Sequence, residues 1–352
     1  MSSAHIVDGR LEVPTIDISP FRDADSPVAQ RDRIAAEVDR AARTVGFMQI
    51  VGHGIPEETL TDFVGATSAF FALDASAKSV YRCPPEVNRG YTPPKSEALA
   101  NSLGLTSAAD LFEAFNVGSQ ASDYPGLDLP ARDYPENVWP TEPADFRAAV
   151  DAWFDVAGGV ARTMVRIFGR ALGIGEDGLS GYTDHSLDVL RTINYRLPSA
   201  DVILEPDQVG MGAHTDYGIV TVLWADAVPG LEILGADGAW YPVQPAPGAL
   251  LVNLGDALAR WTNDQWISTM HRVAAPRVDG VLVPRRSAAY FHDGNVDAVI
   301  APLPTCVSAE RPALYEPVTV GEHLHAKLAG SRNRVLNAAA DREAARLAGP
   351  TG

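Results

Sequence analysis

The chain has 352 residues, of which 46% are hydrophobic and 21% charged, an ordinary composition for a folded globular protein. Its formal net charge of −17 opposes binding to nucleic acid and to anionic membrane lipid. We find no long apolar run, no secretory leader and only two distant cysteines, Cys83 and Cys306, so we expect a cytoplasmic protein without disulfides.

The first half of the chain predicts helices joined by long loops. Apolar residues at helical spacing predict helices over about 28–45, 57–73 and 143–172. "VPTIDISPF" and "GFMQIVGHGI" predict short strands beside the first helix. Between 76 and 137, frequent Pro, Gly, Asn and Ser favour loops, and loops of this length often carry function.

The second half has the pattern of an all-β core. From residue 189 the chain runs through short β-forming stretches separated by turn residues: "VLRTINYRL", "IVTVLWA", "LEIL", "WYPV", "ALLVNLG", "HRVAAP" and "RSAAYFHD". A helical segment over about 320–347 closes the chain. We therefore predict one integrated, mainly β domain: 1–140 wraps the core, 141–188 supplies a long supporting helix, 189–310 forms the core and 311–352 is helical.

The stretch "GMGAHTDYGIVTVLW" places His214 and Asp216 two residues apart. In a strand, residues i and i+2 share a face, so the pair is either a polar edge or two ligands of a metal. His271, in "TMHRVAAP", is a third candidate that could arrive from a facing strand. Two histidines and one carboxylate leave half of an octahedron open, which suits non-haem Fe(II), although a catalytic zinc remains possible.

Arg285 and Ser287, in "VPRRSAAYF", share a strand face, so they are either a carboxylate-binding pair or part of a surface that faces water. A buried arginine favours an anionic ligand as its partner, whereas Arg286, on the opposite face, is expected to point to solvent. Among the remaining histidines, we expect His185, His323 and His325 to face solvent.

Many of these stretches also occur together in one known family. From about position 12 to 330, "VPTIDISPF", "GFMQIVGHGIP", "FFALDASAK", "NRGYTP", "EAFNVG", "GAHTDYGIVTVLW", "STMHRV" and "RRSAAYF" follow one another in the order typical of that family. The chain resembles the Fe(II)/2-oxoglutarate-dependent oxygenases of the isopenicillin N synthase-like branch.

The resemblance implies a double-stranded β-helix, or jelly roll, flanked by helices. It places the iron ligands on His214, Asp216 and His271, and the 2-oxoglutarate carboxylate on Arg285 and Ser287. The family often adds a contact to 2-oxoglutarate from an Asn–Tyr segment, here Asn194 and Tyr195. Arg196 stands where many members have a second tyrosine, which favours a contact between Arg196 and an anionic substrate. The implied reaction consumes O2 and 2-oxoglutarate, releases succinate and CO2, and oxidises a small organic molecule.

Two other functions stay open on the sequence alone. An oxidase of the isopenicillin N synthase type would use the same Arg285 and Ser287 to hold the carboxylate of its own substrate. A non-catalytic binding protein on the same fold would need neither iron nor 2-oxoglutarate. For the substrate, which we expect to belong to specialised metabolism, the first candidate contacts are Arg89, Tyr91, Phe115 and Asn116, because they lie in the loop-rich segment. The oligomeric state is unknown.

Overall fold

The computed structural model describes residues 6–7, 10–103, 109–195, 210–279 and 281–333. Arg196, a predicted substrate contact, lies outside these residues. The same holds for 334–347, the end of the predicted C-terminal helix.

An eight-stranded sheet forms the main wall of the molecule. All of its neighbouring strands are antiparallel except β3 and β4, which run parallel. In spatial order the strands are β3 (Thr15–Asp17), β4 (Phe47–Val51), β12 (Leu250–Leu254), β9 (Val220–Ala225), β16 (Arg286–His292), β7 (Val189–Asn194), β6 (Glu113–Gly118) and β5 (Gly90–Thr92).

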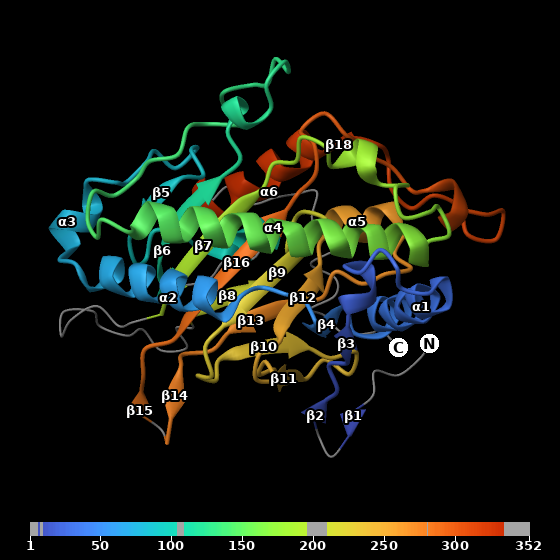
Figure 1. Cartoon of the computed structure of the whole chain (residues 1–352), viewed down its shortest axis with the longest axis horizontal. Coiled ribbons are helices and arrows are strands. Elements are labelled where there is room, and N and C mark those ends of the chain that lie inside the picture. Colours follow the sequence, from blue (N-terminus) through green and yellow to red (C-terminus); the bar gives the residue numbers. More distant parts are fainter. Residues whose placement is uncertain (1–5, 8–9, 104–108, 196–209, 280, 334–352) are drawn as a thin grey trace.

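A four-stranded sheet forms the second wall, in the order β11 (Trp240–Pro242), β10 (Leu231–Leu234), β13 (His271–Val273) and β8 (Met211–His214). Strands of both sheets line one cavity, so the sheets face each other across it. This arrangement is the predicted jelly roll (Figure 1). Within the described residues, the remaining strands form three two-stranded ribbons: β1 (Ile6–Val7) with β2 (Arg10–Leu11), β14 (Arg277–Val278) with β15 (Val281–Leu282), and β17 (Val299–Ile300) with β18 (Val318–Thr319).

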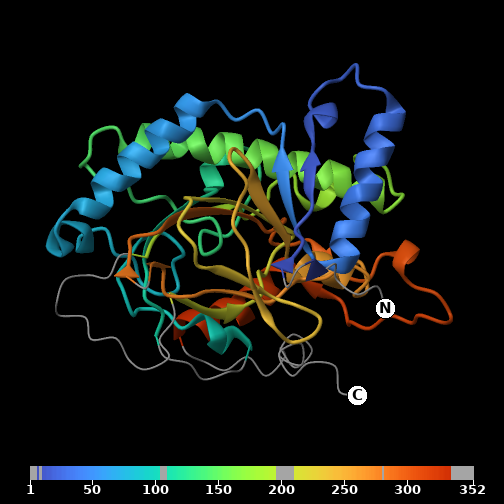
Figure 2. The same ribbon diagram turned by 90° about the horizontal axis from the view of Figure 1, so that it is seen from below.

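Three long helices cover the outside of the larger sheet: α1 (Val28–Thr44), α2 (Glu57–Ala72) and α4 (Phe146–Ala171). Helix α4 packs on β9 and β16, and α1 and α2 pack along α4 (Figures 1 and 2). Trp153, on the buried side of α4, stacks on Phe63 of α2 with ring centroids 4.9 Å apart. Within the described residues, no helix is both long and apolar enough to span a membrane.

The short helices complete the fold. They are α3 (Ala75–Ser79), α5 (Asp256–Trp261), α6 (Val320–Asn333) and the single 3₁₀ turns Ser19–Phe21, Leu99–Leu103, Ala121–Asp123, Ser180–Tyr182 and Pro304–Cys306. Helix α6 contacts the Leu99–Leu103 turn, which in turn lies against β8. Helix α6 also lines the cavity, through residues that include Leu324, Leu328 and Ser331.

Two strands lie inside the segment that we predicted to be loops. β5 and β6 extend the larger sheet through regular pairing with β7. β6 is buried along its whole length although it contains Glu113 and Asn116, and these polar residues hide the strand from a search for apolar periods. The prediction of an irregular 76–137 segment was therefore wrong in this part.

Glu113 is the centre of a buried polar cluster between the larger sheet and α2. Its carboxylate accepts bonds from Lys78 Nζ at 2.7 Å, from the Tyr91 hydroxyl at 2.6 Å and from Asn194 Nδ2 at 2.8 Å. Lys78 also donates to the carbonyl of Phe71. One carboxylate thus compensates a buried ammonium group and ties β5, β6 and β7 to the helical layer.

We expect Glu113→Leu to lower the free energy of unfolding by about 3–5 kcal/mol, because it leaves the Lys78 ammonium buried without its counter-charge. Chemical denaturation measures the change. The double variant Lys78→Met/Glu113→Leu is the control, and it should lose clearly less stability because no unpaired charge remains. A single variant no less stable than the double variant would contradict this role.

Candidate active site

Three side chains meet at one end of the cavity: His214, Asp216 and His271. The Nε2 atoms of His214 and His271 lie 3.8 and 3.7 Å from Asp216 Oδ1, and the two imidazole ring centroids are 4.2 Å apart. All three residues are buried. This spacing lets one metal ion contact all three side chains.

The local structure that brings them together differs in two ways from the prediction. His214 is the last residue of β8, so Asp216 lies just beyond the strand, in the connection to β9. His271 does not come from a facing strand, because it pairs directly with His214 on the adjacent strand of the same four-stranded sheet. Residues directly opposite each other on neighbouring strands are close, which explains why the two rings touch.

Hydrogen bonds turn both histidines towards the same point. Nδ1 of His214 lies 2.8 Å from the carbonyl oxygen of Gly212, and Nδ1 of His271 lies 3.0 Å from that of Thr269. A carbonyl only accepts, so each Nδ1 carries the proton and each Nε2 keeps its lone pair free for a metal. Burial, together with the neighbouring His271, lowers the pKa of His214, which favours the neutral ring.

The two oxygens of the Asp216 carboxylate have different partners. Its Oδ2 accepts bonds from Thr221 Oγ1 at 2.5 Å and from Asn253 Nδ2 at 2.6 Å, whereas Oδ1 points to the histidines. Thr221 lies on β9 and Asn253 on the neighbouring β12. Two neighbouring strands thus fix the orientation of the one acidic ligand candidate, as partners of metal ligands commonly do. The donor set and its orientation fit Fe(II) with open coordination positions.

A second cluster lies further along the cavity wall. Arg285 is 2% exposed, and its Nη1 lies 3.4 Å from Ser287 Oγ. The guanidinium group lies over the Tyr195 ring at 5.1 Å, and its Nε has no hydrogen-bond partner in the described part of the chain. Burial raises the pKa of the Tyr195 phenol, which therefore stays neutral and can donate a bond. A buried cation with spare donors, next to two hydroxyl groups, is suited to a carboxylate.

The structure separates the two residues of the Asn–Tyr segment. Tyr195 lines the cavity, but Asn194 lies on the opposite face of β7, where it donates to Glu113. The alternation of side chains along a strand accounts for this separation. In this structure, Asn194 therefore has no route to a ligand in the cavity.

The four described substrate candidates also divide between the two faces of the larger sheet. Arg89 lines the cavity, where it donates to the carbonyl of Ser119. Tyr91 points away from the cavity, to Glu113, and Phe115 packs among Phe70 and Phe146 in the helical layer. Asn116 does not line the cavity and donates to Asn88, which does.

Sequence reasoning missed three residues of the site. Thr221 and Asn253 fix Asp216, and Arg191 projects from β7 into the cavity with an ion pair to Glu97 at 2.7 Å. The available signal was a polar residue inside an otherwise apolar strand, as in "ALLVNLG" and "VLRTI". Such a residue needs a buried partner, and that partner is often functional.

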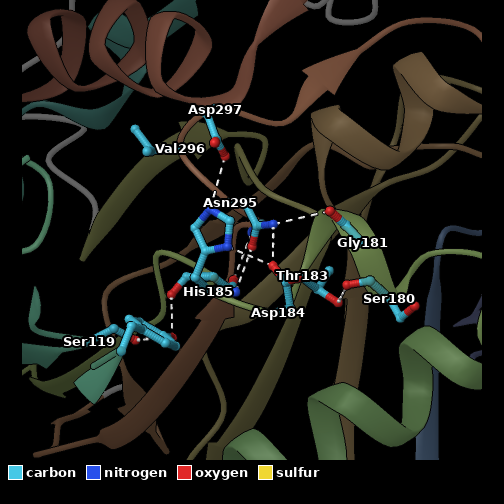
Figure 3. A network of polar contacts seen from close by, with 12 residues as sticks. Ser119, Ser180, Gly181, Thr183, Asp184, His185, Asn295, Val296 and Asp297 are labelled. Carbon is cyan, nitrogen blue, oxygen red and sulfur yellow. Dashed lines mark hydrogen bonds and ion pairs between the residues drawn. The ribbon is translucent and has the colours of Figure 1, made fainter. Parts of the chain in front are cut away.

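Of the three histidines that we expected to face solvent, His323 is buried and His185 is only partly exposed, while His325 is half-buried, lines the cavity and bonds to Asp133. His323, on α6, is 7% exposed and bonds to the carbonyl of Tyr217, and burial lowers its pKa to about 4. His185 lies between Asp184 and Asp297, with Nδ1–Oδ1 and Nε2–Oδ1 distances of 2.6 and 2.9 Å (Figure 3). All three residues have partners from distant segments of the chain, which the local sequence does not reveal.

Comparison with known proteins agrees with this geometry. Residues 13–142 match the family model of the non-haem dioxygenase N-terminal region named for morphine synthesis, and residues 188–294 match that of the 2OG-Fe(II) oxygenase superfamily. The chain is a member of the Fe(II)/2-oxoglutarate-dependent oxygenases, and the predicted class of enzyme and its need for Fe(II), 2-oxoglutarate and O2 are confirmed.

The names of individual relatives and the fold of a solved structure agree with this family. The chain is 31% identical to the 2-oxoglutarate-Fe(II) type oxidoreductase hxnY of Emericella nidulans, over 87% of this chain and 86% of that protein. It is also 31% identical to a homoarginine-6-hydroxylase of Oryza sativa, over 90% and 96%. The crystal structure of a full-length Neurospora crassa protein in complex with alpha-KG and thymine superposes with a TM-score of 0.79 at 28% identity, covering 93% and 99%. These relatives support a 2-oxoglutarate-dependent enzyme, not the 2-oxoglutarate-independent alternative.

We expect Thr221→Val to weaken Fe(II) binding by about 10–100-fold, because Asp216 loses one of the two donors that orient it. Titration of the anaerobic protein with Fe(II) measures the affinity. Thr192→Val is the matched control, since the Thr192 hydroxyl donates to the carbonyl of Phe115 on the helical side of the sheet. Equal affinities in the two variants would show that the Thr221 bond does not support the metal site.

Proposed function

We propose that His214, Asp216 and His271 bind the Fe(II) of this dioxygenase, and that Arg285, Ser287 and Tyr195 hold the distal carboxylate of 2-oxoglutarate. The observation that carries the proposal is the orientation of the three ligand candidates. Both Nδ1 atoms and Asp216 Oδ2 are engaged by the protein, while both Nε2 atoms and Oδ1 converge on one point inside the cavity.

The bound Fe(II), together with 2-oxoglutarate and O2, supplies the oxidising chemistry: 2-oxoglutarate loses CO2 and becomes succinate while the substrate is oxidised. The residues of the chain position the reactants and keep water out. The cavity, of about 220 Å³, has a mainly apolar wall that includes Phe47, Leu223, Leu231 and Phe291. An apolar wall protects a reactive centre and favours an organic substrate.

The substrate that we propose is a small organic molecule of specialised metabolism, which the enzyme hydroxylates, desaturates or cyclises in the cytoplasm. The names of relatives support a small substrate, because homoarginine and thymine are both compact, nitrogen-rich molecules. Arg89, Arg191 and Asp293 are among the polar residues of the cavity wall that can contact it. The net charge of −17 argues against nucleic acid or an anionic membrane as partner.

Anaerobic addition of Fe(II) and 2-oxoglutarate to the wild-type protein should produce a visible charge-transfer band. We expect Asp216→Ala to abolish this band. Arg285→Gln should keep the iron but weaken 2-oxoglutarate binding by about 10–100-fold, because hydrogen bonds to a charged group are lost. Absorbance titration under nitrogen follows both changes.

Arg286→Gln is the matched control for Arg285→Gln, because it removes the neighbouring guanidinium from the other face of the strand and should leave the 2-oxoglutarate affinity unchanged. Succinate release in the presence of candidate substrates, among them homoarginine and thymine, then identifies the compounds that stimulate turnover. The proposal would be wrong if wild type gave no band, or if the Arg285 and Arg286 variants bound 2-oxoglutarate equally.

A further inference from the structure

One wall of the cavity is formed by alternate residues of β16 and its two flanking positions. Arg285, Ser287, Ala289, Phe291 and Asp293 all line the cavity, as the two-residue period of a strand requires. Arg285 stands at one end of this row and Asp293 at the other. The row therefore begins with a buried cation and ends with a carboxylate that the proposed chemistry does not use.

Asp293 lies at the metal end of the row. Thr221, which bonds to Asp216, pairs with Phe291 on the adjacent strand, so the residues around Phe291 lie beside the metal ligands. Eight residues of extended chain span about 26 Å between Arg285 and Asp293. The carboxylate of 2-oxoglutarate that Arg285 holds is therefore far from Asp293. Asp293 is not needed to bind that carboxylate.

The Asp293 carboxylate has no hydrogen bond or ion pair within the described residues. Burial raises its pKa well above the ordinary value, and the nearby carboxylates of Asp188 and Asp216 raise it further. Its two acidic neighbours do have donors: Asp188 accepts from Ser186, Tyr290 and His292, and Asp216 from Thr221 and Asn253. In the described part of the chain, Asp293 alone of these three lacks a donor.

The backbone around Asp293 is fixed on both sides. The carbonyl of His292 accepts from Ile219 N at 3.0 Å, and Gly294 exchanges bonds with Ser186 Oγ and Leu187 N at 2.8 and 2.9 Å. Next along the chain, Asn295 bonds to Gly181, Asp184 and His185, in the network drawn in Figure 3. The carboxylate is therefore held in the cavity wall by a rigid frame, although its position there is electrostatically unfavourable.

The loop that carries Asp216 packs closely against Asp293 at Gly218. A Cβ atom on Gly218, two residues after Asp216, would lie 1.9 Å from Asp293 Oδ1. The loop that carries Asp216 thus fits against Asp293 only because residue 218 is glycine. This close packing places the acid beside the reacting end of the cavity.

Among the described residues, His325 also lines the cavity but is paired with Asp133, and no arginine of the cavity is placed as a counter-charge for Asp293. Of the arginines that line the cavity, Arg191 is already in an ion pair, Arg89 donates to main-chain carbonyls, Arg132 is exposed and Arg285 lies at the far end of the row. We propose that Asp293 binds a protonated amine or guanidinium group of the substrate, and so makes this enzyme selective for cationic molecules. The inference rests on the proposed function, because it assumes that the substrate lies beside the metal site.

The test compares two shape-matched probes, 4-phenylbutylguanidine and its neutral counterpart 4-phenylbutylurea. Calorimetry under nitrogen, on enzyme loaded with Fe(II) and 2-oxoglutarate, gives the Kd of each. Wild type should bind the cationic probe about tenfold or more tightly than the neutral one, as expected for a hydrogen-bonded charge pair. In Asp293→Asn the two affinities should become nearly equal.

Glu86→Gln is the matched control, since Glu86 lines the cavity but is exposed, and this variant should keep the preference for the cation. Asp293→Ser provides a second neutral variant. Both Asp293 variants should unfold close to the wild-type temperature, because within the described residues the Asp293 side chain makes no hydrogen bond or ion pair that the substitutions would remove. This readout separates a binding role from a structural one, which would lower the unfolding temperature.

The proposal is overturned if wild type shows no preference for the cationic probe, if the preference survives in both Asp293 variants, or if Glu86→Gln loses it equally. The charge-transfer band of the same samples reports independently on Fe(II) and 2-oxoglutarate binding. A retained band without cation selectivity would refute the role of Asp293 and leave the proposed function standing. Loss of the band in wild type would refute the proposed function itself.

Discussion

The site depends on the different surroundings of the two oxygens of the Asp216 carboxylate. One oxygen is held by Thr221 and Asn253, and this leaves the other directed at the two histidines. Because the two donors stand on neighbouring strands of the larger sheet, the ligand candidate is oriented by the sheet itself and not by its own loop. The pairing register of β9 and β12 therefore determines the orientation of Asp216.

The same dependence on register explains the layout of the cavity. β8 and β13 place the two imidazoles opposite each other, and β16 presents every second residue to the interior. Residues between these positions face the helices, where they build the buried cluster around Glu113. The strands of the larger sheet thus have one face that lines the cavity and one face that packs against the helices. A shift of a strand by one residue would move its cavity-lining side chains to the helical face.

The sequence predicted much of this arrangement and failed where contacts come from distant parts of the chain. Helices over 28–45, 57–73 and 143–172 and the β-rich second half follow from local periodicity, which a strand or helix carries within itself. β6 was missed because its polar residues are satisfied by Lys78 and Asn88, which lie far from it in sequence.

The candidate site shows the same limit. The types and spacing of His214, Asp216, His271 and Arg285 indicated a metal and an anion, because these patterns are short and chemically specific. The face of β7 to which Asn194 points, and the donors on Asp216, depend on strand pairing that no local pattern encodes. Sequence therefore indicated which residue types matter better than it indicated what surrounds them.

The two ligand histidines belong to the smaller sheet, whereas the side chains that anchor the aspartate belong to the larger one. An ion held by all three residues would be a cross-link between the two halves of the sandwich. Part of the affinity for the metal would then appear as resistance of the whole fold to unfolding, so that iron supply would govern the lifetime of the protein as well as its turnover.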